Sequence, residues 1–181
     1  MRIISGKYKG RIVNMPKGIR PTQGKVRKAL FDILGDLEGL SFLELFAGSG
    51  AIGFEAVSRG AAELTMVESN RNALRQINKN IEDLKPQSCR LYPKESAETI
   101  EKFHRDKNKF DVIFLDPPYH GGIAKKTLQI LGAYDILAPN GFIIIQHFKK
   151  DILPDEAGDL KLFRQSKYGD TVLSFYKICA K

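Results

Sequence analysis

Apolar runs and amphipathic stretches alternate along most of this chain of 181 residues. A stripe of apolar positions at Val26, Leu30 and Ile33, with Ala29 and Leu34 beside it, predicts a first helix that opens at Pro21-Thr22. Lys25, Arg27 and Lys28 are expected to fall mostly off its buried face. Later strands are expected near 41–46, 64–67, 89–92, 110–115, 142–145, 160–164 and 172–176, with helices near 52–58, 73–84, from 96 and at 124–131. This alternation predicts an α/β fold with a mostly parallel, seven-stranded sheet and helices on both faces.

The residues before the first helix have a different pattern. Residues 2–13 form two short apolar stretches around Gly6 and Gly10, which predicts a small β-hairpin. The hairpin and the first helix would together make a basic extension over residues 1–36. A single larger domain would then occupy residues 37–181.

The positive charge of the chain is concentrated in that extension. Residues 1–28 hold nine Lys and Arg and no acid, whereas the rest carries 20 basic and 21 acidic residues, so the segment accounts for the net charge of +8. Such a segment indicates a polyphosphate partner, although a solvated basic tail would give the same composition. The residues expected to contact RNA phosphates are Lys7, Lys9, Arg11, Arg20 and Arg27.

Other compositional features narrow the class of protein. No apolar run reaches the roughly 18 residues that a membrane helix needs, and no signal peptide is evident. Cys89 and Cys179 form neither a metal-ligand spacing nor a disulfide framework. We therefore expect a cytoplasmic protein without a metal.

The four residues at 116–119, with the sequence D-P-P-Y, follow the apolar run at 110–115. Each proline fixes its own φ and lacks an N–H, and Pro118 also holds Pro117 extended. Their carbonyls keep acceptor capacity beside a carboxylate and an aromatic ring, a set that suits the exocyclic amine of a nucleobase. A strand followed by a Pro-Pro turn is the plainer interpretation.

A glycine-rich segment follows the strand at 41–46. Gly48, Gly50 and Gly53 match G-x-G-x-x-G, and Glu68 ends the next strand, where a carboxylate can accept two hydrogen bonds from ribose. The same glycines fit a nicotinamide-binding fold. Glu44 favours the other interpretation, because a carboxylate there would repel a pyrophosphate but attract the ammonium group of a methionine moiety.

Taken in order, these motifs resemble those of the class I S-adenosylmethionine-dependent methyltransferases, including enzymes that modify the amino groups of adenine, cytosine or guanine. Nearly the whole chain resembles the RsmD-type 16S rRNA guanine-N2 methyltransferases, at 2–11, 20–22, 26–27, 30–31, 43–53, 116–119 and 167–171. There are two departures. Lys28 stands where the family usually has an acid, and Gln146 stands where a carboxylate is common.

The resemblance implies a Rossmann-like class I methyltransferase fold and transfer of a methyl group from S-adenosylmethionine to the N2 amine of one guanine in 16S rRNA. S-adenosylhomocysteine is the other product, and no metal takes part. The implied catalytic residues are Asp116, Pro117, Pro118 and Tyr119, with the first two accepting the amine's N–H bonds and Tyr119 stacking on the extruded base. The implied cofactor residues are Glu44 and Phe46, Ala47, Gly48, Ser49 and Gly50 for the methionine end, Glu68 and Ser69 for the ribose, and Ser96 and Ala97 for the adenine.

The expected partner is 16S rRNA, naked or within an assembling small ribosomal subunit, and the protein is expected to be a monomer with no membrane contact. An adenine-N6 or other nucleic-acid amino-methyltransferase is an alternative, although the DNA enzymes usually carry a larger target-recognition region. A catalytically silent RNA-binding assembly factor is another, but it would have no reason to keep Glu44, Glu68 and Asp116 together. We expect surface or structural roles for His104, His120 and His147, with His120 an alternative RNA contact.

Overall fold

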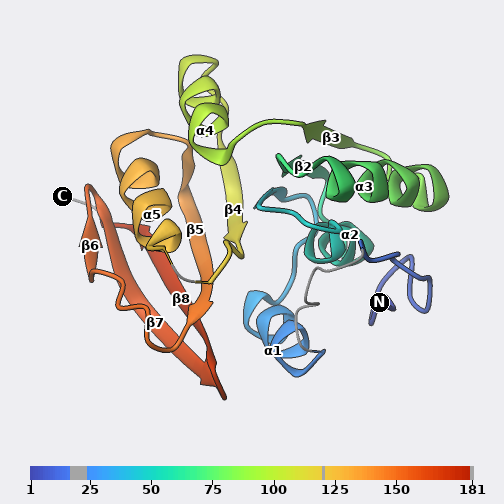
Figure 1. The fold of residues 1–181 in the computed structure, drawn as a ribbon, viewed down its shortest axis with the longest axis horizontal. Coiled ribbons are helices and arrows are strands. Elements are labelled where there is room, and N and C mark those ends of the chain that lie inside the picture. Colours follow the sequence, from blue (N-terminus) through green and yellow to red (C-terminus); the bar gives the residue numbers. More distant parts are fainter. Residues whose placement is uncertain (17–23, 120, 180–181) are drawn as a thin grey trace.

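The computed structural model describes residues 1–16, 24–119 and 121–179, so Pro21-Thr22 lies outside the described part. One sheet runs through the molecule, with helices packed against it (Figure 1). The elements in chain order are α1 (Gly24–Leu34), β1 (Ser41–Leu45), α2 (Ala51–Ser58), β2 (Glu63–Val67), α3 (Arg71–Leu84), β3 (Cys89–Tyr92), α4 (Ser96–Arg105), β4 (Phe110–Leu115), α5 (Ile123–Ala133), β5 (Leu137–Phe148), β6 (Glu156–Ala157), β7 (Leu160–Tyr168) and β8 (Thr171–Ile178).

The strand order of the sheet is β3-β2-β1-β4-β5-β8-β7-β6. Strands β1 to β5 pair in parallel, whereas β8, β7 and β6 extend the sheet in antiparallel pairs beyond β5. Because the chain moves outward from β1 to β3 and then returns to β4 on the other side of β1, the strand order reverses between β1 and β4. Ligands of open α/β sheets bind outside the carboxyl ends of the strands at such a reversal.

The predicted α/β architecture is confirmed, with three differences in detail. The two-residue strand β6, too short to show in a sequence pattern, makes the sheet eight-stranded. Strand β5 begins earlier than predicted, with a register shift near Pro139, which has no N–H to donate. The expected N-terminal hairpin is reduced to one antiparallel bridge between Arg2 and Ile12.

Two hydrophobic cores cover the two faces of the sheet, because successive side chains of a strand point to opposite faces. Val112 and Phe114 of β4 pack on the face covered by α1, α2 and α3, and Ile113 packs on the face covered by α4 and α5. Ile3 and Tyr8 belong to the first of these cores. The N-terminal residues therefore contribute to the packed interior, although a separate function is expected for them.

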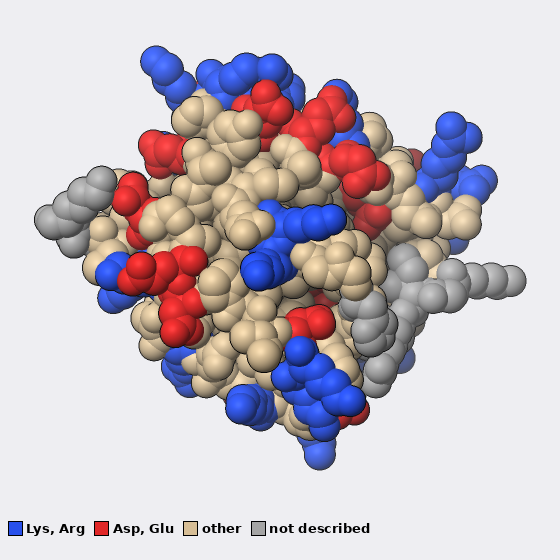
Figure 2. All heavy atoms as spheres, turned by 60° about the vertical axis from the view of Figure 1, so that its left-hand side comes forward, with Lys and Arg blue, Asp and Glu red and all other residues tan. Residues whose placement is uncertain are grey.

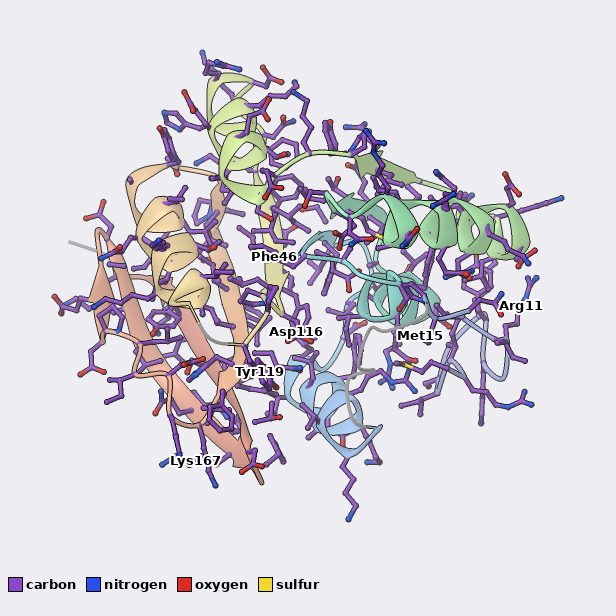
Figure 3. All side chains as sticks on the ribbon, viewed as in Figure 1. Arg11, Met15, Phe46, Asp116, Tyr119 and Lys167 are labelled. Carbon is purple, nitrogen blue, oxygen red and sulfur yellow. The ribbon has the colours of Figure 1, made fainter. Side chains whose placement is uncertain are left out.

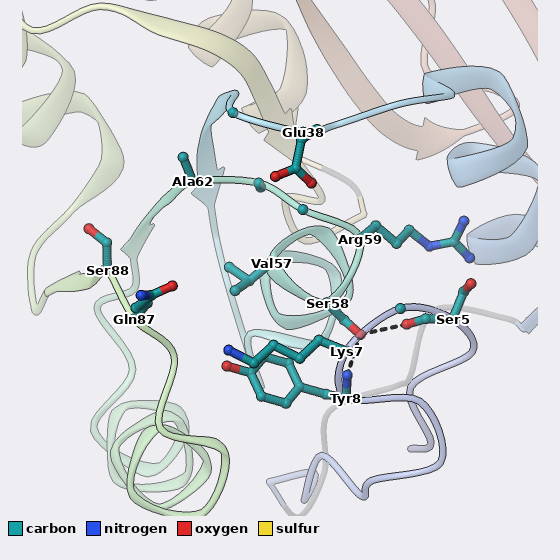
Figure 4. Close-up of a pocket in the computed structure, with 14 residues that line it drawn as sticks. Ser5, Lys7, Tyr8, Glu38, Val57, Ser58, Arg59, Ala62, Gln87 and Ser88 are labelled. Carbon is teal, nitrogen blue, oxygen red and sulfur yellow. Dashed lines mark hydrogen bonds between the residues drawn. The ribbon is translucent and has the colours of Figure 1, made fainter.

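The N-terminal segment, residues 1–16, is fastened to the carboxyl-terminal half of α2 (Figure 4). The fully buried Glu55 accepts the backbone N–H groups of Ile4 at 2.7 Å and Ser5 at 3.1 Å. Ser58 accepts the N–H of Tyr8 at 2.9 Å. Gly6 has a φ of 80°, and a Cβ there would lie 1.6 Å from the Ser58 carbonyl oxygen, so only glycine allows this approach.

Candidate active site

The loop between β1 and α2 turns sharply at the carboxyl end of β1. Phe46 has a φ of 57°, a left-handed conformation that costs energy for a bulky residue and is found mostly at functional sites. Gly50 has a φ of 73°, and a Cβ there would meet Met66 at 2.7 Å and Phe54 at 2.8 Å. The glycine therefore lets the backbone turn into α2 against the adjacent β2.

Glu44 lies under this loop, on β1, with only 3% of its surface exposed. One of its carboxylate oxygens, Oε2, accepts the N–H of Gly53 at 2.9 Å, and a Cβ on Gly53 would lie 2.7 Å from that oxygen. Burial raises the pKa of Glu44 to about 8, and the negative charges of Asp116 and Glu68 also raise it. Carboxylates at the ends of β1, β2 and β4 thus make a site that favours a cation.

Glu68, directly after β2, binds three backbone amides. Its Oε2 accepts the N–H of Gly48 at 2.8 Å, and its Oε1 accepts those of Ser69 at 2.9 Å and Asn70 at 2.8 Å. A carboxylate has about four acceptor positions, so room remains for one ribose hydroxyl. The same side chain also braces the glycine loop, a role that the sequence did not suggest.

Asn80 is a functional candidate that the sequence analysis missed. It is fully buried on α3, and its Nδ2 donates to the carbonyl oxygens of Ser49 and Asn14, both at 3.0 Å. Its Oδ1 accepts the N–H of Asn14 at 2.9 Å. Asn80 therefore joins the glycine loop to the N-terminal segment. The available signal was a polar residue three positions after Ile77, on the apolar side of its helix.

Asp116 follows β4 at the carboxyl edge of the sheet. Gln146 of the neighbouring strand β5 donates from Nε2 to Oδ2 of Asp116 at 2.8 Å. Pro117 is buried and Pro118 is exposed. The acid at 116 is thus held by a side chain from a strand that lies 30 residues further along the chain.

Tyr119 is braced from the antiparallel part of the sheet. Its hydroxyl lies 3.2 Å from Oγ1 of Thr171, and its ring centroid lies 5.8 Å from that of Phe148. Residues 169–170 form the turn between β7 and β8, and Thr171, the first residue of β8, lies against the tyrosine. Figure 3 shows Phe46, Asp116 and Tyr119 in the central part of the molecule. The loops after β1 and β4 therefore meet, as expected for neighbouring parallel strands.

Ser96 and Ala97 begin α4, directly after β3. Ser96 is buried and Ala97 is exposed, while Ser69 is exposed beyond β2. Because β2 and β3 are parallel neighbours, these residues and Glu68 lie at the same edge of the sheet.

The predicted RNA contacts do not share one environment. Lys7, Lys9 and Arg11 are exposed, and Arg11 also donates to the backbone carbonyl of Asp83, far from Asp116 (Figure 3). Arg27 was expected off the buried face of α1, and that expectation is wrong. Its side chain is 5% exposed and donates from Nη2 to the carbonyl of Arg2 at 2.7 Å.

Arg20 and His120 lie outside the described residues. His147 is buried, with Nε2 2.8 Å from the Ser174 hydroxyl, and this burial lowers its pKa. His104 lies at the surface, where its Nδ1 accepts the N–H of Asp135 at 3.2 Å.

A separate groove of about 760 Å³ lies beside the N-terminal segment (Figure 4). Its walls include Lys7, Tyr8, Arg59, Glu38 and Gln87. Residues just before β1, β2 and β3 line it, so it opens at the amino ends of these strands, away from the glycine loop.

Within the described ranges, no group of three or more His, Cys, Asp and Glu side chains is arranged to hold a metal ion. No helix in the same ranges is long and apolar enough to cross a membrane.

The comparisons with known proteins agree with this geometry. The family described as "Conserved hypothetical protein 95" matches residues 1–177. The "Putative rRNA methyltransferase YlbH" of Bacillus subtilis is 34% identical over 98% of both chains. The "Ribosomal RNA small subunit methyltransferase D" of Escherichia coli K12 is 31% identical over 98% of this chain and 89% of the relative. A solved structure titled "Putative methyltransferase yhhF from Escherichia coli" has a TM-score of 0.88 and 31% identity, covering 100% of this chain and 99% of that one. The predicted class I methyltransferase fold is confirmed.

Proposed function

The chain belongs to the Conserved hypothetical protein 95 family, that of ribosomal RNA small subunit methyltransferase D, and on that premise we propose that it methylates the N2 amine of a guanine in 16S rRNA, with S-adenosylmethionine as the methyl donor. One observation carries the proposal. The glycine loop and the Asp116 loop end neighbouring parallel strands where the strand order reverses.

The residues present fit a cationic cofactor. Burial chiefly, with the charges of Asp116 and Glu68 in addition, favours the protonated form of Glu44 and raises its pKa, and S-adenosylmethionine would bring an ammonium and a sulfonium group to this site. Glu44 and the backbone of residues 46–50 would hold the methionine end, Glu68 and Ser69 the ribose, and Ser96 and Ala97 the adenine. When bound, the cofactor supplies a methyl group that the sulfonium has already activated.

Asp116 and the Pro117 carbonyl would orient the guanine amine. The lone pair of this nitrogen is delocalised into the ring, which makes the amine a poor nucleophile. Two acceptors on its N–H groups favour a more tetrahedral nitrogen and direct the lone pair away from the acceptors. Positioning and electrostatic stabilisation of this kind supply most of the rate in many enzymes. Asp116 can also receive the proton that the amine loses.

Tyr119 would stack on the base after it has left its helix. Its hydrogen bond to Thr171 and its contact with Phe148 hold the ring in place before the base arrives. Pro118 is exposed beside it and would give the base an apolar edge.

The RNA itself would be bound through Lys7, Lys9 and Arg11, the exposed cations of the N-terminal segment. We keep residues 1–36 as the RNA-facing extension and 37–181 as the catalytic part. Arg20 stays in this proposal, whereas the buried Arg27 is assigned to holding Arg2.

The test is Asp116→Ala in single-turnover methylation of small-subunit RNA from cells that lack the gene. Loss of a positioned acceptor should slow methyl transfer by roughly 10²–10⁴-fold, while cofactor affinity stays near that of the wild type. The matched control is Asp32→Ala, which removes an exposed carboxylate that pairs with Lys28 on the surface of α1. An Asp116→Ala enzyme within about threefold of wild type would remove Asp116 from the mechanism.

Analysis of the methylated nucleosides decides between the alternatives. N2-methylguanosine from the wild type supports the proposal, and N6-methyladenosine would support the adenine enzyme. RNA binding without any methylation would support an assembly factor. Calorimetric titration with S-adenosylmethionine and with NAD tests the nicotinamide alternative.

A further inference from the structure

Gln146 has a buried polar atom that lacks a hydrogen-bond partner. The residue is 4% exposed, and although its Nε2 donates to Asp116, its Oε1 has no hydrogen-bond partner among the residues that the structure describes. Leaving a buried acceptor unpaired costs about 1–3 kcal/mol, and native proteins rarely leave one so. The unpaired oxygen therefore points to a donor that a ligand would bring.

The place of this atom in the fold identifies the ligand's position. Leu115 of β4 is in register with Ile145 of β5, so the next residues along these strands are Asp116 and Gln146. Because Oε1 and Nε2 belong to one planar carboxamide, the unpaired oxygen lies beside the carboxylate that is proposed to hold the reacting amine.

Asp116 also fixes which way the amide is turned. An ionised carboxylate accepts hydrogen bonds and cannot donate them, so it must face the NH₂ end of Gln146. The carboxamide oxygen then stays available as an acceptor. One N–H of Gln146 is used on Asp116, and the two residues together present two kinds of acceptor oxygen side by side.

We propose that Gln146 selects guanine by accepting the ring N–H next to the reacting amine. In guanine the N2 amine is flanked by N1–H, a donor. The amines of adenine and cytosine are instead flanked by a ring nitrogen that is an acceptor, and two acceptors that face each other leave both unpaired. This inference rests on the proposed function and assigns the base preference of that same site.

The burial of Oε1 affects both the strength and the timing of this contact. The atom has almost no surface accessible to solvent, so the ring N–H would compete little with water for it. The base can reach it only when the groups that cover it move aside. The contact would therefore form as the base enters, and a base without the ring donor would leave the oxygen unpaired.

The experiment compares two RNAs that differ at the mapped target nucleotide. One carries guanine and the other carries 2-aminopurine, which keeps the 2-amine but has an acceptor in place of N1–H. Wild-type enzyme should methylate the guanine RNA faster by roughly 10–100-fold in single turnovers, as expected for one lost hydrogen bond to a buried acceptor. Gln146→Met removes the acceptor at similar length and should bring the two rates to within about threefold, mainly by slowing the guanine reaction.

Gln146→Glu provides a second variant with a different signature. It keeps an acceptor oxygen but places a new carboxylate beside Asp116, with Glu44 and Glu68 as the other ionisable groups that face this site from β1 and β2. Two such carboxylates cannot both ionise cheaply, so one shared proton would restore the donor to Asp116. The variant should be inactive at high pH, where both carboxylates are ionised. Its activity should appear only at a lower pH than that of the wild type, and its preference for guanine should return together with the activity.

The outcomes separate the inference from the function on which it rests. If wild type makes N2-methylguanosine but does not discriminate against 2-aminopurine, the inference is wrong and the function stands. The same conclusion follows if Gln146→Met slows both substrates equally, because Gln146 would then only position Asp116. A wild-type enzyme that makes no N2-methylguanosine in the guanine RNA would overturn both the inference and the proposed function. Calorimetry with S-adenosylhomocysteine shows whether each variant is folded. If Gln146→Met does not fold, the Gln146→Glu variant decides the question.

Discussion

Glu44 is the buried residue whose ionisation we expect to depend most strongly on the bound cofactor. Folding raises its pKa from 4.5 to about 8, chiefly by taking the carboxylate out of water. An acid whose pKa is raised by folding makes its full contribution to stability below about pH 4.5, and this contribution is lost progressively as the pH rises to about 8. A bound cation should lower the pKa of Glu44 again, because it favours the ionised carboxylate.

We therefore expect the binding of S-adenosylmethionine at about pH 7 to release up to about one proton, because Glu44 ionises next to the ammonium group. Cofactor affinity should rise as the pH approaches about 8 and then level off. Calorimetry in buffers of different ionisation enthalpy measures the proton count directly. Gln has the same shape and cannot titrate, so Glu44→Gln should bind without this release. An unchanged proton count in that variant would mean that another group titrates.

At the scale of elements, α2 and α3 connect the cofactor loop to the N-terminal segment. The glycine loop lies at the amino end of α2, and Glu55 and Ser58 near its other end bind the segment. Asn80 of α3 makes a direct link, because it holds Ser49 and Asn14 at once. The segment and the loop are thus joined through one buried side chain.

Asn80→Ala should loosen both ends of that link. Three hydrogen bonds disappear and two backbone carbonyls lose a buried donor, so we expect a loss of about 1–3 kcal/mol in the free energy of unfolding. Faster hydrogen exchange in residues 1–16 and weaker cofactor binding should accompany it. The exposed Asn78 on the same helix provides the control, Asn78→Ala. Wild-type exchange and affinity in Asn80→Ala would show that the link carries no coupling.

The sequence predicted most of the elements because apolar periodicity is a local property. The short apolar runs of β1 and β4 and the stripe on α3 are each visible within a few residues. Likewise, D-P-P-Y and the glycines are short motifs, so the chemistry that they indicate can be recognised within a few residues. The fold then needed only the rule that the carboxyl ends of parallel strands meet at one edge.

The polar residues inside the fold could not be predicted in the same way. Arg27, Glu55, Asn80 and Gln146 find partners 25 to 66 residues away in the chain. A pattern that marks a helix face cannot show which polar side chain on it will meet a distant backbone group. For this reason Arg27 was expected at the surface, and Glu55 and Asn80 were not singled out.

At the scale of the whole molecule, the distribution of charge separates the N-terminal segment from the remainder. The face shown in Figure 2, on the side of the C-terminal strands, carries Lys and Arg intermixed with Asp and Glu. In the C-terminal strands and their turns, Lys161 pairs with Glu156 and Lys149 pairs with Asp170. Lys7 and Lys9 instead extend from a segment that has no acidic residue, and Glu55 and Asn80 fix that segment relative to the active site.

If Lys7 and Lys9 contact phosphates, RNA affinity should fall steeply with salt, and each contact should contribute about 0.7–0.9 to the slope of log K against log salt. Lys7→Ala combined with Lys9→Ala should therefore flatten the slope by roughly 1.4–1.8 and leave cofactor affinity unchanged. Lys94→Ala combined with Lys102→Ala removes the same charge from α4 and its preceding turn, where both lysines pair with acids, so it should leave the slope unchanged. Filter binding or fluorescence anisotropy over a range of salt concentrations measures both. A Lys7/Lys9 variant with wild-type salt dependence and activity would mean that RNA binds elsewhere, and the surface around Arg164 and Lys167 would then be the next to test.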